Sequence, residues 1–285
     1  MALNWNTFFT RLGSAIVFCL IMMAGLLWHT WAFLLLFLLI TFLALQEYAY
    51  LVAHIIGTSF WRNVMLNYLV SGVLLFLVVA SLPLSLCDDV AAHTLAHMRY
   101  YLFGLFGGAL LVFFLFAGSK KNYYLLTGFG YIPLSLGLLV QLRYQSLYLP
   151  LILILMIWMN DTLAYLCGSI FGKRPFFPSI SPKKTLEGTI GGMLFTMALA
   201  AVWGHYTNWF PMGCWTGLGL IASVAGTAGD LAESKLKRLA GVKDSGSLMP
   251  GHGGALDRFD SLLFAAPPAF LLSLIYDVCL PAKVF

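Results

Sequence analysis

Long apolar segments follow one another along almost the whole chain, and they limit what it can fold into. A helix needs about 20 apolar residues to cross about 30 Å of hydrocarbon. Charged residues make up only 9% of the chain, against about 25% in a soluble domain, which is too few to cover a water-facing surface. The sequence therefore predicts an all-α, polytopic membrane protein with about nine transmembrane helices, and eight is the alternative count. The nine expected spans are about 11–28, 31–50, 64–87, 99–117, 123–142, 147–171, 188–205, 213–230 and 260–280.

The first apolar segment follows Arg11 and could also serve as a signal peptide. No small-residue cleavage site follows it cleanly, and another apolar segment begins at once. We therefore expect the segment to be retained as the first membrane span.

Lys and Arg are divided unevenly between the loops on the two sides of the membrane. With the N-terminus inside, 13 of the 16 Lys and Arg fall on the cytoplasmic side, and only Arg99, Arg143 and Lys283 fall outside. Cytoplasmic loops carry an excess of Lys and Arg. The distribution therefore predicts a cytoplasmic N-terminus and a periplasmic or lumenal C-terminus.

Polar residues are concentrated in the second half of the chain. We expect residues 1–150 to form apolar N-terminal transmembrane helices, with aromatic residues such as Trp28 and Tyr48 as anchors at the membrane interface. Residues 151–285 form the region that carries the chemistry, with cytoplasmic loops at 172–187 and 231–259.

The first polar cluster is Asn160-Asp161-Thr162, inside the sixth expected span. A carboxylate at membrane depth is costly and must face a partner or water. Tyr165 and Gly168 follow at helical spacing, so they share the face of Asp161. The cluster is either a functional site or a structural polar contact between helices.

The second cluster runs from Ser181 to Gly188, with the sequence SPKKTLEG. Ser181 followed by a proline predicts a helix N-cap. Free N–H groups at a helix start, together with Lys183 and Lys184, would form an anion site. The alternative is a positively charged loop that only sets membrane topology. Gly188 and Gly192 allow close packing against a neighbouring helix.

The third cluster spans residues 229–244, which we predict to continue the eighth apolar segment as a helix. Asp230, Ser234, Lys237 and Arg238 lie at i, i+4, i+7 and i+8, so they share one face. That face offers a carboxylate, a hydroxyl and two cations in line. A carboxylate can hold a metal ion while the cations bind phosphates.

A glycine-rich segment follows at residues 250–260, just before the last expected span. Glycines let the backbone approach a ligand closely and form N–H nests for anions. Asp257 and Asp260 are three residues apart near a helix start, where a capping role is the alternative for Asp260. The other residues of interest here are His252, Gly253, Gly254 and Arg258.

Aspartate oxygens without clustered Cys or His favour hard cations, above all Mg²⁺. The five cysteines include no CxxC pair, which excludes a zinc site built on such pairs. Mg²⁺, phosphate-binding cations and a membrane-embedded frame together fit phosphoryl or nucleotidyl transfer to a lipid.

The stretch from Ser234 to Asp260 resembles the signature of the phosphatidate cytidylyltransferase (CDP-diacylglycerol synthase) family. Met249 and Ala255 stand where the pattern usually has other apolar residues, which carry no chemistry. The Asn160 and Ser181 clusters also resemble family motifs in the right order, and the close resemblance covers about residues 155–268. The matching positions are Lys237–Arg238, Lys243–Asp244, His252-Gly253-Gly254 and Asp257-Arg258-Phe259-Asp260.

The resemblance implies transfer of CMP from CTP to phosphatidate, giving CDP-diacylglycerol and pyrophosphate. It also implies Mg²⁺, a second, monovalent cation such as K⁺, a homodimer, and an active site facing the cytoplasm, in the inner membrane if the source is bacterial. The expected partners are CTP, phosphatidate and membrane lipids, without nucleic acid.

These expectations assign a role to each residue of the predicted site. The metal ligands are Asp230 and Asp257. The catalytic residues are Lys237, Arg238, Lys243, Asp244, His252, Arg258 and Asp260. The substrate-binding residues are Asn160, Asp161, Ser181, Lys183, Lys184, Thr185, Ser234, Gly253 and Gly254. Because a phosphate nucleophile is already anionic, His252 is expected to position substrate rather than act as a base.

Three other classes share some of these features. A CTP-dependent lipid kinase would need a base for its alcohol substrate and would release CDP. A CDP-alcohol phosphotransferase would need an Asp-Gly, Ala-Arg and spaced-aspartate pattern that the sequence lacks. A transporter using Asp161 and Asp230 would show broken helices in both halves, whereas the polar features here occupy one half.

Overall fold

The computed structural model describes residues 5–57, 62–81, 120–207, 209–248 and 253–276. These residues divide into two compact units. Of the described residues, the first unit contains 5–57, 62–81, 120–140, 236–248 and 253–259, and the second contains 141–207, 209–235 and 260–276. Each unit therefore combines segments that are distant in the sequence. The predicted boundary near residue 150 stays a prediction.

The described residues form eight long helices, which confirms the all-α class. They are α1 (Trp5–Leu27), α2 (Thr30–Ile56), α3 (Arg62–Ser81), α5 (Lys120–Gln145), α6 (Tyr148–Phe171), α7 (Leu186–Thr207), α8 (Met212–Leu239) and α9 (Leu256–Ile275). Each corresponds to one expected span, and the remaining expected span, 99–117, lies outside the described residues.

Six of the described helices are long and apolar enough to cross a membrane, namely α2, α3, α5, α6, α7 and α9. The protein is therefore a multi-pass membrane protein. In α1 the apolar stretch is the shorter segment Leu12–Leu27. In α8 the last turn carries Lys237 and Arg238, so its apolar part does not extend to its end.

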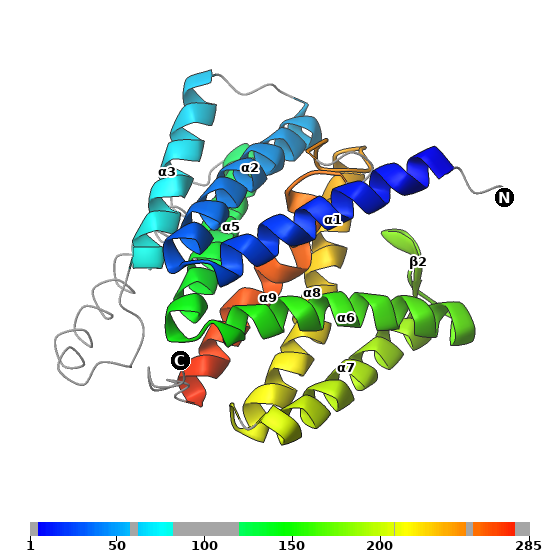
Figure 1. Ribbon diagram of the computed structural model, residues 1–285. Coiled ribbons are helices and arrows are strands. Elements are labelled where there is room, and N and C mark those ends of the chain that lie inside the picture. The colour runs from blue at the N-terminus through cyan, green and yellow to red at the C-terminus, as the bar shows by residue number, and fades with distance from the viewer. Residues whose placement is uncertain (1–4, 58–61, 82–119, 208, 249–252, 277–285) are drawn as a thin grey trace, which may run out of the picture. The chain divides into compact units, whose positions relative to one another are not determined.

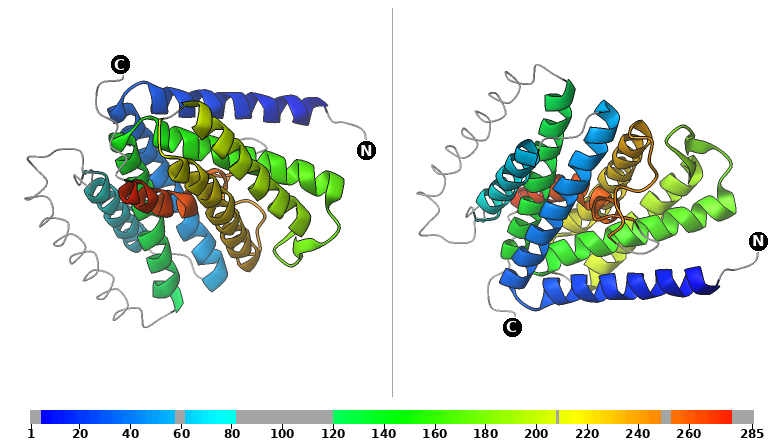
Figure 2. Two further views of the ribbon diagram at one scale, coloured as in Figure 1. Left: turned by 90° about the horizontal axis from the view of Figure 1, so that it is seen from below. Right: turned by 90° about the horizontal axis from the view of Figure 1, so that it is seen from above.

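In the first unit α2 packs against α3, and its Tyr48 hydroxyl lies 2.8 Å from the Thr127 hydroxyl of α5, which runs alongside (Figures 1 and 2). Phe33, Phe37 and Leu45 of α2 are fully buried. Phe259, in the first turn of α9, packs its ring edge-on against Phe37, with centroids 5.9 Å apart. An aromatic anchor thus ties the beginning of α9 to the N-terminal helices of this unit.

The second unit is held together by small residues between helices. α6 and α7 lie side by side (Figures 1 and 2). A β-carbon on Gly192 would lie 2.8 Å from that of Ala164, and one on Gly188 would lie 2.7 Å from the Ala164 carbonyl oxygen. The predicted close packing through Gly188 and Gly192 is confirmed. Gly229 of α8 similarly leaves no room for a side chain beside the Asp260 carbonyl oxygen of α9.

A short hairpin between α6 and α7 departs from the prediction. Strand β1 (Pro175–Phe177) pairs antiparallel with β2 (Ser181–Thr185). Glu187, in the first turn of α7, accepts hydrogen bonds from the backbone N–H groups of Lys173 and Arg174 at 3.0 and 3.1 Å. The hairpin is thereby fastened to the helix that follows it.

The prediction that Ser181 caps a helix is therefore wrong, because residues 181–185 form a strand and α7 begins at Leu186. The side chain of Thr185 takes the capping position instead. Its Oγ1 accepts a hydrogen bond from the Gly188 N–H at 3.1 Å. This contact satisfies one of the N–H groups that a helix start leaves without a partner.

Candidate active site

The glycine-rich turn before α9 is organised by the carboxylate of Asp257. Its Oδ2 accepts hydrogen bonds from the backbone N–H groups of Ser245 and Gly254, both at 2.8 Å, and from the Ser245 hydroxyl at 2.9 Å. Its Oδ1 accepts from the Lys237 ammonium at 2.5 Å. Gly253 has a φ of +83°, a conformation that glycine adopts without strain. The structure thus brings Lys237, Asp257 and the predicted glycines together.

Glu47 of α2 also binds this turn, and sequence reasoning missed it. Its Oε1 accepts from the Ala255 N–H, and its Oε2 accepts from the Leu256 N–H and the Ser245 hydroxyl, each at 2.8 Å. Glu47 lies inside an apolar helix, and a lone carboxylate in such a helix was the available signal. Its partner could not be read from the sequence, since the two segments are 208 positions apart.

The second predicted metal ligand, Asp230, lies in the second unit. Its Oδ2 forms an ion pair with the ammonium of Lys184 from β2. Its Oδ1 accepts a hydrogen bond from the hydroxyl of Ser234, one turn later on α8, at 3.3 Å. The hairpin therefore brings a predicted substrate-binding lysine to a predicted metal ligand. The expected continuation of the eighth span as a helix is confirmed as far as Leu239, whereas residues 240–244 lie outside the helix.

Asn160 lies on α6 with only 3% of its surface exposed. Its amide Oδ1 has no hydrogen-bond partner among the residues that the structure describes. A buried polar atom in this state is costly and usually has a ligand, water or ion as partner. Asp161 next to it is exposed, as expected for a carboxylate that must reach water or a ligand.

Most of the remaining predicted residues are exposed or make contacts within their own segment. Arg238 donates to the Val242 carbonyl oxygen at 3.3 Å, near the end of α8. Asp260 Oδ1 accepts from the Ser261 N–H at 2.6 Å, inside α9, which begins four residues earlier at Leu256. His252 lies outside the described residues. The side chains of Lys183, Lys243, Asp244 and Arg258 are exposed.

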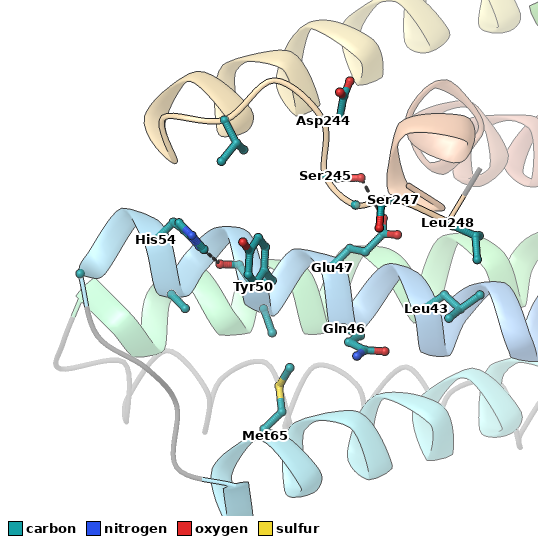
Figure 3. Close-up of a pocket in the computed structure, with 15 residues that line it drawn as sticks. Leu43, Gln46, Glu47, Tyr50, His54, Met65, Asp244, Ser245, Ser247 and Leu248 are labelled. Carbon is teal, nitrogen blue, oxygen red and sulfur yellow. Dashed lines mark hydrogen bonds between the residues drawn. The ribbon is translucent and has the colours of Figure 1, made fainter. Parts of the chain in front are cut away.

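A cavity of about 1000 Å³ opens beside the loop that follows α8 (Figure 3). One wall comes from α2 and the other from residues 242–248, and Glu47 and Ser245 meet at its edge. Its volume is at the upper end of the range for small-molecule sites. Its other polar lining residues are Gln46, Tyr50, His54, Asp244 and Ser247.

The donor set suits a hard divalent cation in its chemistry. Among the described residues no three His, Cys, Asp or Glu side chains gather as a metal cluster. Mg²⁺ needs fewer protein ligands, since it shares one or two carboxylates with substrate phosphates and keeps several waters. Asp230 and Asp257 each present one carboxylate oxygen to a lysine ammonium, so both positions already attract a cation.

The fold defines a class, that of multi-pass helical membrane proteins, and each of the two units carries a lysine–aspartate ion pair. Within this class, the chain belongs to the cytidylyltransferase family, whose model matches residues 9–276. The resemblance deduced from the sequence motifs is thereby confirmed for the family.

Two curated relatives with similar sequences are both named phosphatidate cytidylyltransferase. The chain is 43% identical over 140 residues to the phosphatidate cytidylyltransferase of Staphylococcus aureus (strain COL), an alignment that covers 48% of this chain and 54% of the relative. It is 39% identical over 170 residues to the phosphatidate cytidylyltransferase of Aquifex aeolicus (strain VF5), which covers 58% of this chain and 63% of the relative. The matching part of the chain thus spans a little more than half the length of these relatives.

Proposed function

We propose that the protein is a phosphatidate cytidylyltransferase, which transfers CMP from CTP to phosphatidate. The observation that carries the proposal is the turn around Asp257, where a carboxylate, the Lys237 ammonium and a glycine-rich backbone converge within a membrane-protein family of cytidylyltransferases. Such a turn places an ammonium, which can bind phosphate, beside a carboxylate, which can bind a cation. A nucleoside triphosphate with its divalent cation needs both.

In the proposed reaction a phosphate oxygen of phosphatidate attacks the α-phosphorus of CTP. The bond from that phosphorus to the oxygen bridging to the β-phosphorus breaks, and pyrophosphate leaves with the electron pair. Lys237, Arg238, Lys243 and Arg258 stabilise the negative charge of the phosphates. Lys184 and Lys183 attract the lipid phosphate. The attacking phosphate is already anionic, so the reaction requires no general base.

Asp230 and Asp257 are proposed to hold Mg²⁺, and a monovalent cation such as K⁺ accompanies it. When bound, the divalent ion would neutralise charge on the triphosphate. The lysine beside each aspartate supports this assignment, because an ammonium occupies a position where a carboxylate oxygen attracts a cation. The buried Oδ1 of Asn160 is a further oxygen ligand available to substrate or cation.

The finer topology belongs to the same proposal. We infer nine spans, a cytoplasmic N-terminus and an active site open to the cytoplasm, where CTP is found. The uneven distribution of Lys and Arg supports this orientation. A homodimer that acts without nucleic acid completes the proposal. A reporter fused at Phe285 that is active only on the cytoplasmic side would contradict the orientation.

The deciding experiment incubates the purified protein in detergent with CTP labelled in the cytidine, phosphatidate and Mg²⁺. The proposal expects labelled CDP-diacylglycerol and one pyrophosphate for each lipid product. Release of CDP with an alcohol substrate would instead identify a lipid kinase. The absence of any CTP turnover, with lipid and Mg²⁺ present, would contradict an enzymatic role and leave the transporter alternative.

A further inference from the structure

We propose that Glu47, in the apolar N-terminal part of the chain, is a positioning residue for the turn that carries Asp257. Its effect on catalysis rests on the proposed function, whereas its effect on the turn does not. All the groups involved belong to the first compact unit. The proposal assigns a role in the active site to α2, a helix outside the motifs that identify the family in this sequence.

The first argument comes from the beginning of α9. The first N–H groups of a helix have no acceptor within the helix and need one from elsewhere. Gly254 donates its N–H to Asp257, a residue three positions later. The next two N–H groups, of Ala255 and Leu256, donate to Glu47 at 2.8 Å. A carboxylate from α2 therefore completes the cap that Asp257 begins.

The second argument is the hydroxyl of Ser245, which lies between the two carboxylates. Its Oγ is 2.8 Å from Glu47 Oε2 and 2.9 Å from Asp257 Oδ2. A hydroxyl has one proton, so it donates to one of these oxygens at a time. The position of Ser245, and through it that of Asp257, thus depends on Glu47.

The third argument is that two glycines of the turn lie against this carboxylate at positions where a side chain would collide with it. A β-carbon on Gly246 or on Gly254 would collide with the carboxylate of Glu47. Two glycines therefore let the backbone close around Glu47 from both sides. Such close fitting, inside a helix where a carboxylate is costly, favours a specific role over an incidental contact.

Substitution of Glu47 by Gln provides the most specific test. Glutamine has the same shape, but one of its two terminal atoms is an NH₂ group that cannot accept a hydrogen bond. At least one of the three donors to Glu47 would lose its acceptor and face another donor. We expect the amides of Ala255 and Leu256 to exchange hydrogen about tenfold faster or more in Glu47→Gln, measured by mass spectrometry on peptides covering 253–260.

Activity provides the second measurement. We expect kcat for CTP and phosphatidate to fall about tenfold or more in Glu47→Gln, with a smaller change in KM. The reason is that Asp257 would be displaced but still present. Glu47→Asp, which keeps the charge but is one methylene shorter, should give an intermediate loss. Ser245→Ala removes only the bridging hydroxyl and should also lower kcat and speed up hydrogen exchange in the turn. It therefore tests the proposal if Glu47→Gln does not fold.

Phe42→Leu is the matched control, since Phe42 lies on the exposed side of the same helix and does not line the cavity. It should leave kcat and exchange at 253–260 within twofold of the wild type. Wild-type kcat in Glu47→Gln would overturn the proposal, whatever the exchange shows. A loss of kcat with unchanged exchange of the turn would overturn it as well. The two proposals can fail separately. If the wild-type protein shows no cytidylyltransferase activity, the proposed function is wrong. If hydrogen exchange at 253–260 is unchanged in Glu47→Gln, Glu47 does not position the turn.

Discussion

The two aspartates of the candidate site are held in different ways. Asp257 receives two backbone N–H groups, a hydroxyl and an ammonium, and its ion pair with Lys237 is nearly closed to solvent, with side-chain exposures of 5% and 12%. Asp230 is held by side chains, the Lys184 ammonium and the Ser234 hydroxyl, and that ion pair is about a third exposed, at 31% and 27%. The Asp257 carboxylate is therefore held in one orientation by its turn, whereas the Asp230 carboxylate can exchange partners.

This difference predicts how far each carboxylate can change its orientation. Backbone donors have no rotamers to change, so the orientation of Asp257 is preorganised before substrate arrives. A lysine and a serine in partial contact with water can move aside when a charged ligand competes for Asp230. We therefore expect Asp257 to keep its orientation under conditions in which Asp230 changes its partners.

The largest expected effect is the loss of activity in Asp257→Asn. The amide NH₂ would replace an acceptor among several donors, and Lys237 would lose its counter-charge. We expect kcat to fall about 1000-fold. The measurement is the formation of labelled CDP-diacylglycerol by purified protein. Full activity in this variant would contradict the assignment of Asp257 to the active site.

Replacing each lysine by methionine compares the ion pairs directly. Lys237→Met leaves a nearly buried carboxylate without its counter-ion and should destabilise the first unit by about 3 kcal/mol. Lys184→Met breaks a partly exposed pair and should cost less than about 1 kcal/mol. Unfolding of the purified variants in denaturant gives both values.

Lys235→Met is the control for the lysine variants, because Lys235 is exposed on the same helix as Lys237. It should unfold like the wild type. Equal losses of stability in Lys237→Met and Lys184→Met would contradict the distinction between a fixed and an adaptable aspartate.

Asp230→Asn tests whether the adaptable aspartate contributes to metal binding. Its Oδ1 could still accept from Ser234, but the charge that attracts a cation would be gone. We expect the Mg²⁺ concentration that gives half-maximal activity to rise about tenfold. Titration of Mg²⁺ at fixed CTP and phosphatidate measures it, and an unchanged titration curve would argue against a metal ligand at this position.

The smallest expected effect concerns the start of α7. Thr185→Ala removes the hydroxyl that accepts from Gly188 and should lower the stability of the second unit by about 1 kcal/mol. Ser181→Ala, in the same strand, should change stability by less than half of that, because Ser181 caps no helix. A thermal shift assay on both variants is sufficient. A larger effect at Ser181 than at Thr185 would contradict the capping role of Thr185.

The sequence by itself determined the class of protein and most of its helices. Apolar segments of membrane-spanning length and the shared face of Asp230 and Ser234 are local patterns, and a helix repeats them without help from distant residues. The dense signature from Ser234 to Asp260 likewise indicated the family, since fixed polar residues are recognisable without a structure. The hairpin at 175–185 was not predicted, because Ser181-Pro182 is typical of a helix start. Only pairing with Pro175–Phe177 makes this segment a strand.

Only the tertiary structure decided which donors and acceptors meet. Glu47 finds its partners about 200 residues away, and Lys184 reaches Asp230 from another element. Hydrogen bonds and ion pairs act over a few ångströms, whereas a sequence records only the order of residues along the chain. The apolar pattern therefore predicts a membrane protein, but only the fold shows that Glu47 of α2 binds the turn around Asp257.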